Sequence, residues 1–378
     1  MTDKKPILLA GGYGLVGRQV AKLIRQQHPD LSLLIAGRNL EKAELLANEL
    51  GNSQGIQLDV EQPNPLKGEQ PSAIVAIVNA PYDYLLLDAV NGGIPYLDVT
   101  RWPERLRASI TELADKPLQA PVLFASGWMG GIASVIAVAA AQTLAKTERI
   151  DISVLFSLKD KSGPNSVEYM DRLAIPFKTM VSGQLKSVLP YTDPHTLTIP
   201  NGYTTSVYRY DTPDQMTLPQ TTEATTVTAR IAFDDAFSTN FLRFLTRSGI
   251  WRLISSMRFT ALRRSLLYSP GRGASHEIHI AVTGKGADNA SQQTIATIVD
   301  PQGQTHLTAL GALIQLDRLL GLDGAKAPNP AIVYPDTAPQ IDHALRLLAQ
   351  FGVTASGLPE ADRRPLQQHT AALLPTLV

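Results

Sequence analysis

Three glycines, Gly12, Gly14 and Gly17, follow the apolar run at residues 6–10 with the spacing Gly-x-Gly-x-x-Gly. The first permits a tight turn, the second lets a pyrophosphate approach the backbone, and the third lets a helix lie close on the strand. The residues that follow have helical spacing, and the N-terminus of a helix attracts anions. An ordinary glycine loop is the alternative, but strand, turn and helix together predict a dinucleotide site. Its loop residues are Gly12, Tyr13, Gly14, Leu15, Val16 and Gly17.

The second apolar run, at residues 31–36, ends in Gly37, Arg38 and Asn39. A site that prefers NAD places an acid here, on the ribose 2'-hydroxyl, and a flavin dinucleotide site usually does the same. Arg38 and Asn39 therefore favour NADP over NAD and FAD. Alternatively, Arg38 is a solvated charge and Asn39 is the N-cap of the next helix.

The third apolar run, at residues 55–60, ends in Asp59 and Val60. The fourth, at residues 73–78, is followed by Asn79, Ala80 and Pro81. The carboxyl ends of parallel strands share one edge of a sheet, where the ligand of such a sheet binds. We expect the third strand end to lie near the adenine and the fourth near the nicotinamide, although Asp59 is equally typical of a turn. The residues expected to contact the cofactor here are Asp59, Val60, Asn79, Ala80 and Pro81.

Tyr82 and Asp98 are the candidate catalytic residues because both lie at strand ends on the same edge. A phenol that donates a proton and a carboxylate beside a developing cation fit chemistry at a carbon–nitrogen double bond. A packed phenol and a turn carboxylate are the structural alternatives. None of the eleven tyrosines has a lysine four residues later, so the Tyr-x-x-x-Lys acid is absent. His276 and His279 would face opposite sides of a strand, and we expect no metal site.

Alternating apolar strands and helices up to residue 147 predict an α/β fold with a Rossmann doubly wound sheet. From residue 149 the apolar residues recur with period two, which is typical of strands covered on one face. We expect three segments: 1–147 as the NADP-binding domain, 148–301 as an inserted α+β domain on a largely antiparallel sheet for substrate binding and dimerisation, and 302–378 as a return to the Rossmann domain plus a tail. The period-two strands are expected at 203–210, 225–233, 276–283 and 294–299.

The ordered motifs resemble the saccharopine dehydrogenase-like family. They are the glycine loop, residues 36–39, Asn79-Ala80-Pro81-Tyr82, Tyr96-Leu97-Asp98 and the glycine loop after Pro121. The resemblance implies an NADP-binding domain with an inserted sheet domain for substrate binding and dimer contacts, and oxidation or reduction of a carbon–nitrogen bond. Relatives of the family reduce carbon–carbon double bonds. The family usually has Pro-Gly in the loop after the sixth strand, where this chain has Gly130-Gly131.

The composition limits the possible partners. Lysine plus arginine and aspartate plus glutamate both number 34, so overall charge does not favour nucleic acid. There is no cysteine, which excludes disulfides and thiolate chemistry. The N-terminal apolar run is too short for a signal peptide, and the apolar segment at residues 132–145 is too short to span a bilayer. We expect a cytoplasmic protein.

One stretch departs from this balance of charge. Between Asp235 and Glu277 there is no acid and no lysine, and aromatic and aliphatic residues alternate with arginines. We expect helices in this stretch. They could pack in the core with paired arginines, bind carboxylates or phosphates of a substrate, or lie on an anionic membrane surface. The arginines are Arg243, Arg247, Arg252, Arg258, Arg263, Arg264 and Arg272.

The sequence thus predicts an NADP(H)-dependent oxidoreductase that transfers hydride to or from a carbon–nitrogen bond in a cleft between domains. Its partners would be a small-molecule substrate, anionic or apolar, and a second copy of the chain in a homodimer. An enoyl reductase acting on an acyl chain or a carrier-bound substrate is the first alternative. A non-catalytic NADP-binding sensor or scaffold at a lipid surface is the second.

Overall fold

The computed structural model describes residues 5–160, 172–199, 203–254, 259 and 273–358. The chain forms two compact units, which are described separately below. The first contains Met1–Ile132 and Thr305–Leu347, and the second contains Ala133–Gln304 and continues from Leu348. The unit boundaries therefore differ from those expected at residues 147 and 301. The segment after Leu348 joins the second unit because its strand pairs within the second unit's sheet.

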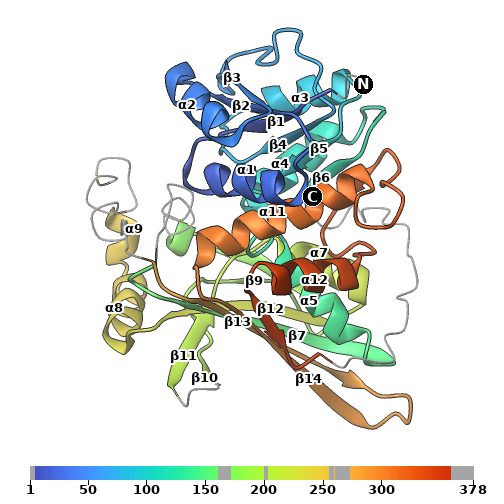
Figure 1. Ribbon diagram of the computed structural model, residues 1–378. Coiled ribbons are helices and arrows are strands. Elements are labelled where there is room, and N and C mark those ends of the chain that lie inside the picture. Colours follow the sequence, from blue (N-terminus) through green and yellow to red (C-terminus); the bar gives the residue numbers. More distant parts are fainter. Residues whose placement is uncertain (1–4, 161–171, 200–202, 255–258, 260–272, 359–378) are drawn as a thin grey trace. The chain divides into compact units, whose positions relative to one another are not determined.

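The first unit contains a seven-stranded sheet in the order β15-β6-β5-β4-β1-β2-β3 (Figure 1). All of its strand pairs are parallel. β1 and β4 are buried and apolar at every position, as in parallel sheets that are covered on both faces. This order is the doubly wound arrangement, so the predicted Rossmann sheet is confirmed. The strands are β1 (Ile7–Ala10), β2 (Leu33–Gly37), β3 (Ser53–Gln57), β4 (Ala73–Ala76), β5 (Tyr96–Asp98), β6 (Val122–Phe124) and β15 (Ile332–Val333).

Local sequence determines where the helices of this unit begin. The Asn39 side chain accepts a hydrogen bond from the Lys42 backbone N–H at 2.9 Å and caps α2, as the sequence suggested. No element was assigned from the sequence between Thr100 and Pro121, where α4 lies with Pro103 in its first turn. The helices are α1 (Leu15–Gln27), α2 (Leu40–Leu50), α3 (Tyr84–Asn91), α4 (Pro103–Leu113), α11 (Gln304–Leu320) and α12 (Ile341–Gln350).

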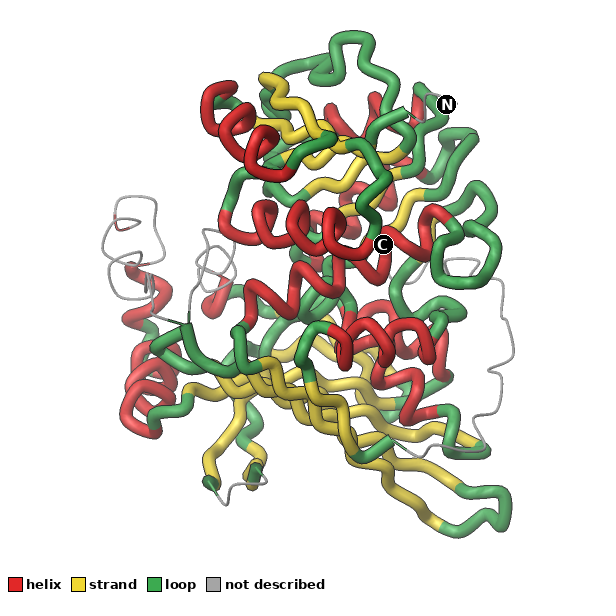
Figure 2. The backbone as a smooth tube through the Cα atoms, in the orientation of Figure 1, coloured by secondary structure: helices red, strands yellow, loops and turns green. Residues whose placement is uncertain are grey.

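The second unit contains a mixed sheet in the order β10-β11-β12-β7-β13-β14-β16. Figure 2 draws its strands, like those of the first sheet, in yellow. β12 and β7 pair in parallel, and the other neighbours pair antiparallel. Alternation along β7 buries Ile150, Ile152 and Val154 on one face. The largely antiparallel second sheet is thus confirmed. The strands are β7 (Lys146–Phe156), β10 (His195–Thr198), β11 (Thr204–Arg209), β12 (Thr226–Phe233), β13 (His276–Lys285), β14 (Ser291–Asp300) and β16 (Thr354–Ser356).

A separate hairpin and several helices complete the described part of this unit. The Asp235 side chain accepts a hydrogen bond from the Ser238 backbone N–H at 2.7 Å and caps α8. In the ranges that the structure describes, no helix is both long and apolar enough to cross a bilayer. The elements are β8 (Phe177–Val181), β9 (Gln184–Val188), η1 (Arg172–Ala174), α5 (Ile132–Ala141), α7 (Asp214–Thr222), α8 (Ala236–Arg247) and α9 (Ile250–Ile254).

His276 gives the second sheet a predictable response to pH. It lies on the apolar face of β13, in line with Ile278 and Ile280, and its ring meets Phe156 edge-on with centroids 5.5 Å apart. Burial lowers the pKa of His276 to about 3, from 6.5. Between these values the unfolded chain binds a proton that the folded chain does not. The free energy of unfolding therefore decreases as the pH is lowered below 6.5, by up to about 1.4 kcal/mol per pH unit.

Replacing this side chain, His276→Leu, should remove that component of the pH dependence. Urea unfolding at several pH values between about 7 and 4 would measure it. The free energy of unfolding of the wild type, minus that of the variant, should become smaller as the pH falls. If the two curves ran parallel over this range, the buried histidine would not be the group responsible.

Candidate functional site

The glycine loop between β1 and α1 is shaped by close backbone contacts. Gly11 has a φ of 83°, and its N–H donates to the Ala36 carbonyl oxygen at 2.9 Å. The left-handed residue of the turn is therefore Gly11, whereas the sequence pattern assigned the turn to Gly12. A Cβ on Gly12 would lie 2.9 Å from the Leu9 carbonyl oxygen, so Gly12 is needed for space. A Cβ on Gly17 would collide with the Gly11 carbonyl oxygen, which matches the predicted close packing of helix on strand.

The N-terminus of α1 has the properties of an anion site. Gly14 is exposed and is the N-cap, with no side-chain hydrogen bond at the cap and no acid in the first turn. The first N–H groups of a helix have no partner within the helix, and the helix dipole adds positive potential there. These features suit a pyrophosphate, which would approach over Gly14, Leu15 and Val16.

Tyr13 ties the glycine loop to the end of β2. Its hydroxyl oxygen accepts a hydrogen bond from the Asn39 backbone N–H at 2.9 Å. Its ring covers Gly37, where a Cβ would collide with the ring atoms. The sequence placed Tyr13 and Asn39 in one site without showing this bond. The Tyr13–Asn39 hydrogen bond fixes the distance between the glycine loop and the end of β2, the two segments that a dinucleotide contacts in such a sheet.

Arg38 stands in solvent beside this bond. Its backbone carbonyl oxygen accepts from Gln57 Nε2 at 3.1 Å, whereas its side chain is 75% exposed. The nearest carboxylate oxygen in an ion pair with it belongs to Glu61, at 4.0 Å. Exposed pairs of this length contribute little to stability, so the guanidinium can leave Glu61 for a stronger anion.

The aspartate at the third strand end holds a turn. Asp59 is half-buried, and its Oδ1 accepts the Glu61 backbone N–H at 3.1 Å, which is the behaviour of a turn residue. Val60 next to it is buried and lines a hollow at the carboxyl edge of the sheet. This strand end therefore contributes an apolar wall to the site and holds the turn that forms it.

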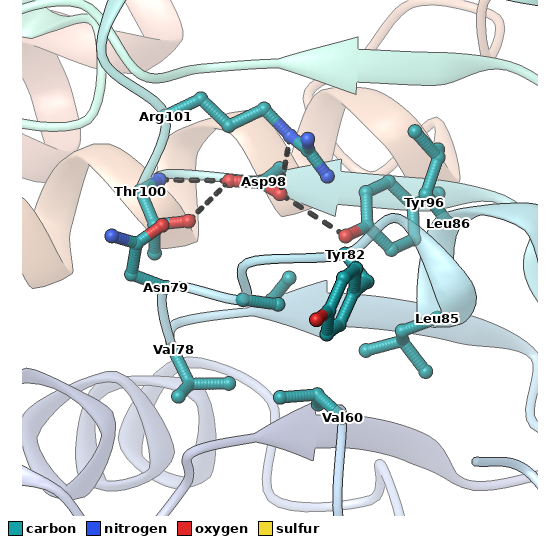
Figure 3. A pocket seen from close by; sticks show the side chains of 12 residues that line it. Val60, Val78, Asn79, Tyr82, Leu85, Leu86, Tyr96, Asp98, Thr100 and Arg101 are labelled. Atoms are coloured by element: carbon teal, nitrogen blue, oxygen red, sulfur yellow. Dashed lines mark hydrogen bonds and ion pairs between the residues drawn. The ribbon is translucent and has the colours of Figure 1, made fainter. Parts of the chain in front are cut away.

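That hollow has an empty volume of ≈ 290 Å³, part of it open to solvent, and lies within the first unit (Figure 3). The apolar part of its wall comes from residues such as Val78, Leu85 and Leu86. Pro81, the glycine loop and Arg38 do not line it. Of the residues predicted for the site, it brings together Val60, Asn79, Ala80, Tyr82 and Asp98.

Asp98 is buried and both of its carboxylate oxygens are occupied. Oδ1 accepts the Thr100 backbone N–H at 2.8 Å and the Thr100 hydroxyl at 2.7 Å. Oδ2 accepts the Tyr96 hydroxyl at 3.0 Å and Arg101 Nε at 2.9 Å, as Figure 3 shows. Burial, assisted by the Asp98 charge, raises the pKa of Tyr96 well above its ordinary value. The geometry therefore makes Asp98 a positioning residue.

Arg101 extends this cluster to the loop that carries Tyr82. Burial opposes its charge, but the Asp98 and Asp83 carboxylates outweigh that effect and raise the pKa of Arg101. Its Nη1 lies 2.5 Å from Asp83 Oδ1, which also accepts from Arg105 Nη2 at 2.8 Å. Arg105 donates in addition to the Ala80 carbonyl oxygen at 3.3 Å. Sequence reasoning missed Asp83, Arg101 and Arg105, although two arginines four residues apart beside Pro103 were a visible signal.

Tyr82 is the exposed group of the site. Its side chain is 54% exposed and packs against Tyr84 with ring centroids 5.2 Å apart. Within the part of the chain that the structure describes, its hydroxyl has no hydrogen-bond partner. Tyr82 is thus available as a proton donor, whereas Asp98 is fully engaged.

The remaining candidates lie elsewhere. His279 Nδ1 is 3.2 Å from the Thr297 hydroxyl, and His276 packs against Phe156, so both contacts are with strands of the second unit's sheet. Gly130 and Gly131 both have positive φ, and a Cβ on Gly131 would collide with Pro335. Four of the seven arginines fall outside the described residues, namely Arg258, Arg263, Arg264 and Arg272.

A scan against protein-family models finds no match, and neither does a search of curated proteins. Among solved structures, apo histidine-tagged saccharopine dehydrogenase (L-Glu forming) from Saccharomyces cerevisiae is similar over 93% of this chain and 99% of its own. The TM-score is 0.66 at 15% identity. The two proteins share a fold. The resemblance suggested by the motifs is thus supported at the level of the fold.

Two further solved structures align over almost the whole chain. Amine dehydrogenase from Mycobacterium smegmatis covers 96% of this chain and 99% of its own, with a TM-score of 0.45 and 12% identity. Myo-inositol dehydrogenase from Corynebacterium glutamicum covers 95% and 100%, with a TM-score of 0.41 and 16% identity. The fold assignment rests on saccharopine dehydrogenase.

The charge cluster gives a test of the role of Asp98. Asp98→Asn should lower the free energy of unfolding by about 3–5 kcal/mol, because it leaves the Arg101 guanidinium buried beside a neutral amide. Asp59→Asn, at a half-buried turn, is the matched control and should cost less than about 1 kcal/mol. Urea unfolding at neutral pH measures both. A stable Asp98→Asn variant would show that the cluster does not depend on this carboxylate.

Proposed function

We propose that the protein is an NADP(H)-dependent oxidoreductase that acts on carbon–nitrogen bonds. The observation that carries the proposal is the Tyr13–Asn39 hydrogen bond, which holds an anion-binding helix N-terminus beside the strand end that bears Arg38. A dinucleotide spans these two features in a doubly wound sheet. The saccharopine dehydrogenase that shares the fold is named for dehydrogenation, which supports the same class of reaction.

The residues present fit the phosphates of NADP. Gly14 and the first turn of α1 would hold the pyrophosphate, and Arg38 would hold the 2'-phosphate. Arg38 suits this role because its guanidinium is largely exposed and only distantly paired with Glu61. Asn39 is already engaged, with its backbone N–H on Tyr13 and its side chain on Lys42. Discrimination between the two nicotinamide cofactors would therefore depend on Arg38.

The hollow beside Asn79 and Tyr82 is the proposed reaction site. The bound nicotinamide cofactor would supply or accept a hydride. The apolar wall, which includes Val78 and Leu85, would shield one side of the reacting carbon from water. The charge cluster fixes the loop, since Arg105 bonds Ala80 and Arg101 bonds Asp83. These residues orient a substrate, and Tyr82 is the group that can hold or move a proton.

Reduction of an iminium suits this arrangement better than reduction of a carbonyl. A carbonyl needs a donor for the developing alkoxide, whereas an iminium carries its charge in advance and mainly needs placement. The described site provides firm positioning through buried ion pairs and only one exposed hydroxyl. Reduction of an enoyl group remains the alternative, because the apolar wall would also accept an acyl chain.

The choice of cofactor depends on Arg38. Arg38→Ala should weaken NADPH binding by about ten- to a hundredfold and leave NADH binding nearly unchanged, because a charge-assisted contact contributes about 1.5–3 kcal/mol. Titration calorimetry with both cofactors measures the difference. Arg346→Ala, an exposed arginine on α12, is the control and should change neither affinity. Equal losses for the two cofactors would contradict the assignment.

The chemistry can be tested at Tyr82. If the substrate is an iminium, Tyr82→Phe should lower kcat by less than about tenfold, because the hydride step needs no proton. If the substrate is an enoyl thioester, loss of the proton donor should lower kcat by about 10²–10⁴-fold.

NADPH oxidation should be followed with cyclic imines, with amine and 2-oxo acid pairs, and with enoyl thioesters, for the wild type and for Tyr82→Phe. Turnover of thioesters alone would replace the first proposal with the enoyl reductase. Tight NADPH binding without turnover of any of these substrates would favour the non-catalytic sensor.

A further inference from the structure

Helix α8 has apolar residues on two opposite faces. Thr239 and Leu242 are buried within the second unit and form the inner face of α8. Phe237, Phe241 and Phe244 follow one another at intervals of four and three residues, so they share the other face. Their side chains are 77%, 46% and 59% exposed. Phe237 and Phe241 stack with ring centroids 6.0 Å apart, so the face is an ordered aromatic row in solvent.

The short helix α9 continues this face. Trp251 is buried and anchors α9, whereas Ile250 and Leu253 are 37% and 73% exposed. Figure 1 shows α8 and α9 side by side at one end of the second sheet. Large exposed apolar patches on soluble proteins usually mark contact sites. We call the following residues the outer apolar surface: Phe237, Phe241, Phe244, Ile250 and Leu253.

The charged residues of α8 and α9 are all arginines, and the acids Asp234 and Asp235 lie just before the N-terminus of α8. Arg243, Arg247 and Arg252 are exposed, and Arg243 lies over the Tyr208 ring at 5.6 Å. In the described ranges, neither Arg247 nor Arg252 forms an ion pair. The sequence has no acid between Asp235 and Glu277. A partner for this surface must therefore present both apolar material and negative charge.

We propose that the outer apolar surface and its arginines bind the surface of an anionic lipid bilayer. Phenylalanine and leucine side chains would enter the boundary between headgroups and acyl chains, and the arginines would contact the lipid phosphates. The helices would lie in the plane of the interface and would not span it. Binding of this kind is separate from the proposed hydride chemistry, whose residues lie in the first unit.

A second copy of the chain is a poorer partner for the same residues. In a two-fold dimer the same surface occurs on both sides, so the arginines of α8 and α9 would approach their own copies. An anionic bilayer instead meets each arginine with a phosphate. A protein with an acidic amphipathic surface would satisfy the same chemistry and is distinguished by the test below.

The test uses the full chain and vesicles of defined composition. Sedimentation with phosphatidylcholine vesicles containing about one third phosphatidylglycerol should recover the protein, and pure phosphatidylcholine vesicles should recover much less. Binding should weaken as salt rises, because the arginine contribution is screened. No recovery with the anionic vesicles at low salt would overturn the proposal.

Two pairs of substitutions separate the contribution of the arginines to vesicle binding from that of the phenylalanines. Arg247→Gln with Arg252→Gln should weaken binding to anionic vesicles by about thirtyfold, because each surface arginine contributes about fivefold. Phe237→Ser with Phe244→Ser should abolish binding to both kinds of vesicle. Lys178→Gln with Lys186→Gln, two exposed lysines on β8 and β9 of the same unit, is the matched control and should bind as the wild type does.

Circular dichroism and NADPH titration would show that each variant remains folded. An equal loss in the lysine control would overturn the proposal, because binding would then follow net charge alone. Light scattering without vesicles supplies the last outcome. Concentration-dependent dimerisation that Phe237→Ser with Phe244→Ser removes, together with no recovery on vesicles, would assign the surface to a second copy.

Discussion

The buried ion pair between Arg101 and Asp98 is the interaction on which the proposed site depends. A guanidinium in this position is costly unless carboxylates compensate it, and here both Asp98 and Asp83 do so. Arg105 balances the second carboxylate. The cluster joins the end of β5, the loop after β4 and the start of α4. Removing Asp98 leaves the buried Arg101 with Asp83 alone, and removing Arg101 leaves Asp98 without its cation. The shape of the hollow and the stability of the first unit are therefore linked.

This dependence explains which parts of the site could be predicted from the sequence. The glycine loop and the strand ends were predictable because their signals are local, a spacing of glycines and apolar runs that end in polar residues. The role of Asp98 was not, because it depends on Asp83, fifteen residues earlier, and on a helix that the periodicity did not reveal. An isolated aspartate after a strand fits catalysis and structure equally well. Only its four hydrogen bonds identify it as a positioning residue.

In the second unit, too, the sequence predicted the elements better than it predicted their contacts. Period-two alternation predicted strands of its sheet, since each strand buries one face. The amphipathic pattern between Asp235 and Glu277 predicted helices but not which face points inward. Thr239 and Leu242 occupy the inner face of α8, and the larger phenylalanines point outward. Hydrophobicity alone would have placed Phe237 and Phe244 in the core. Their exposure is the observation on which the proposed bilayer-binding surface depends.

Arg38 and the outer apolar surface illustrate one physical rule about exposed groups. Among the described residues, the Arg38 side chain is paired only with Glu61, at 4.0 Å. A phosphate that replaces Glu61 gains charge-assisted hydrogen bonds while the protein gives up little. The phenylalanines of α8 are likewise ordered in advance, through the stacking of Phe237 on Phe241 and the anchoring of the helix by Leu242. A ligand that meets pre-ordered groups bears a smaller entropy cost on binding. Arg101 is buried and already paired with Asp98 and Asp83, so it is not available to a ligand. Arg38 and the phenylalanines could recognise ligands, whereas Arg101 maintains the site.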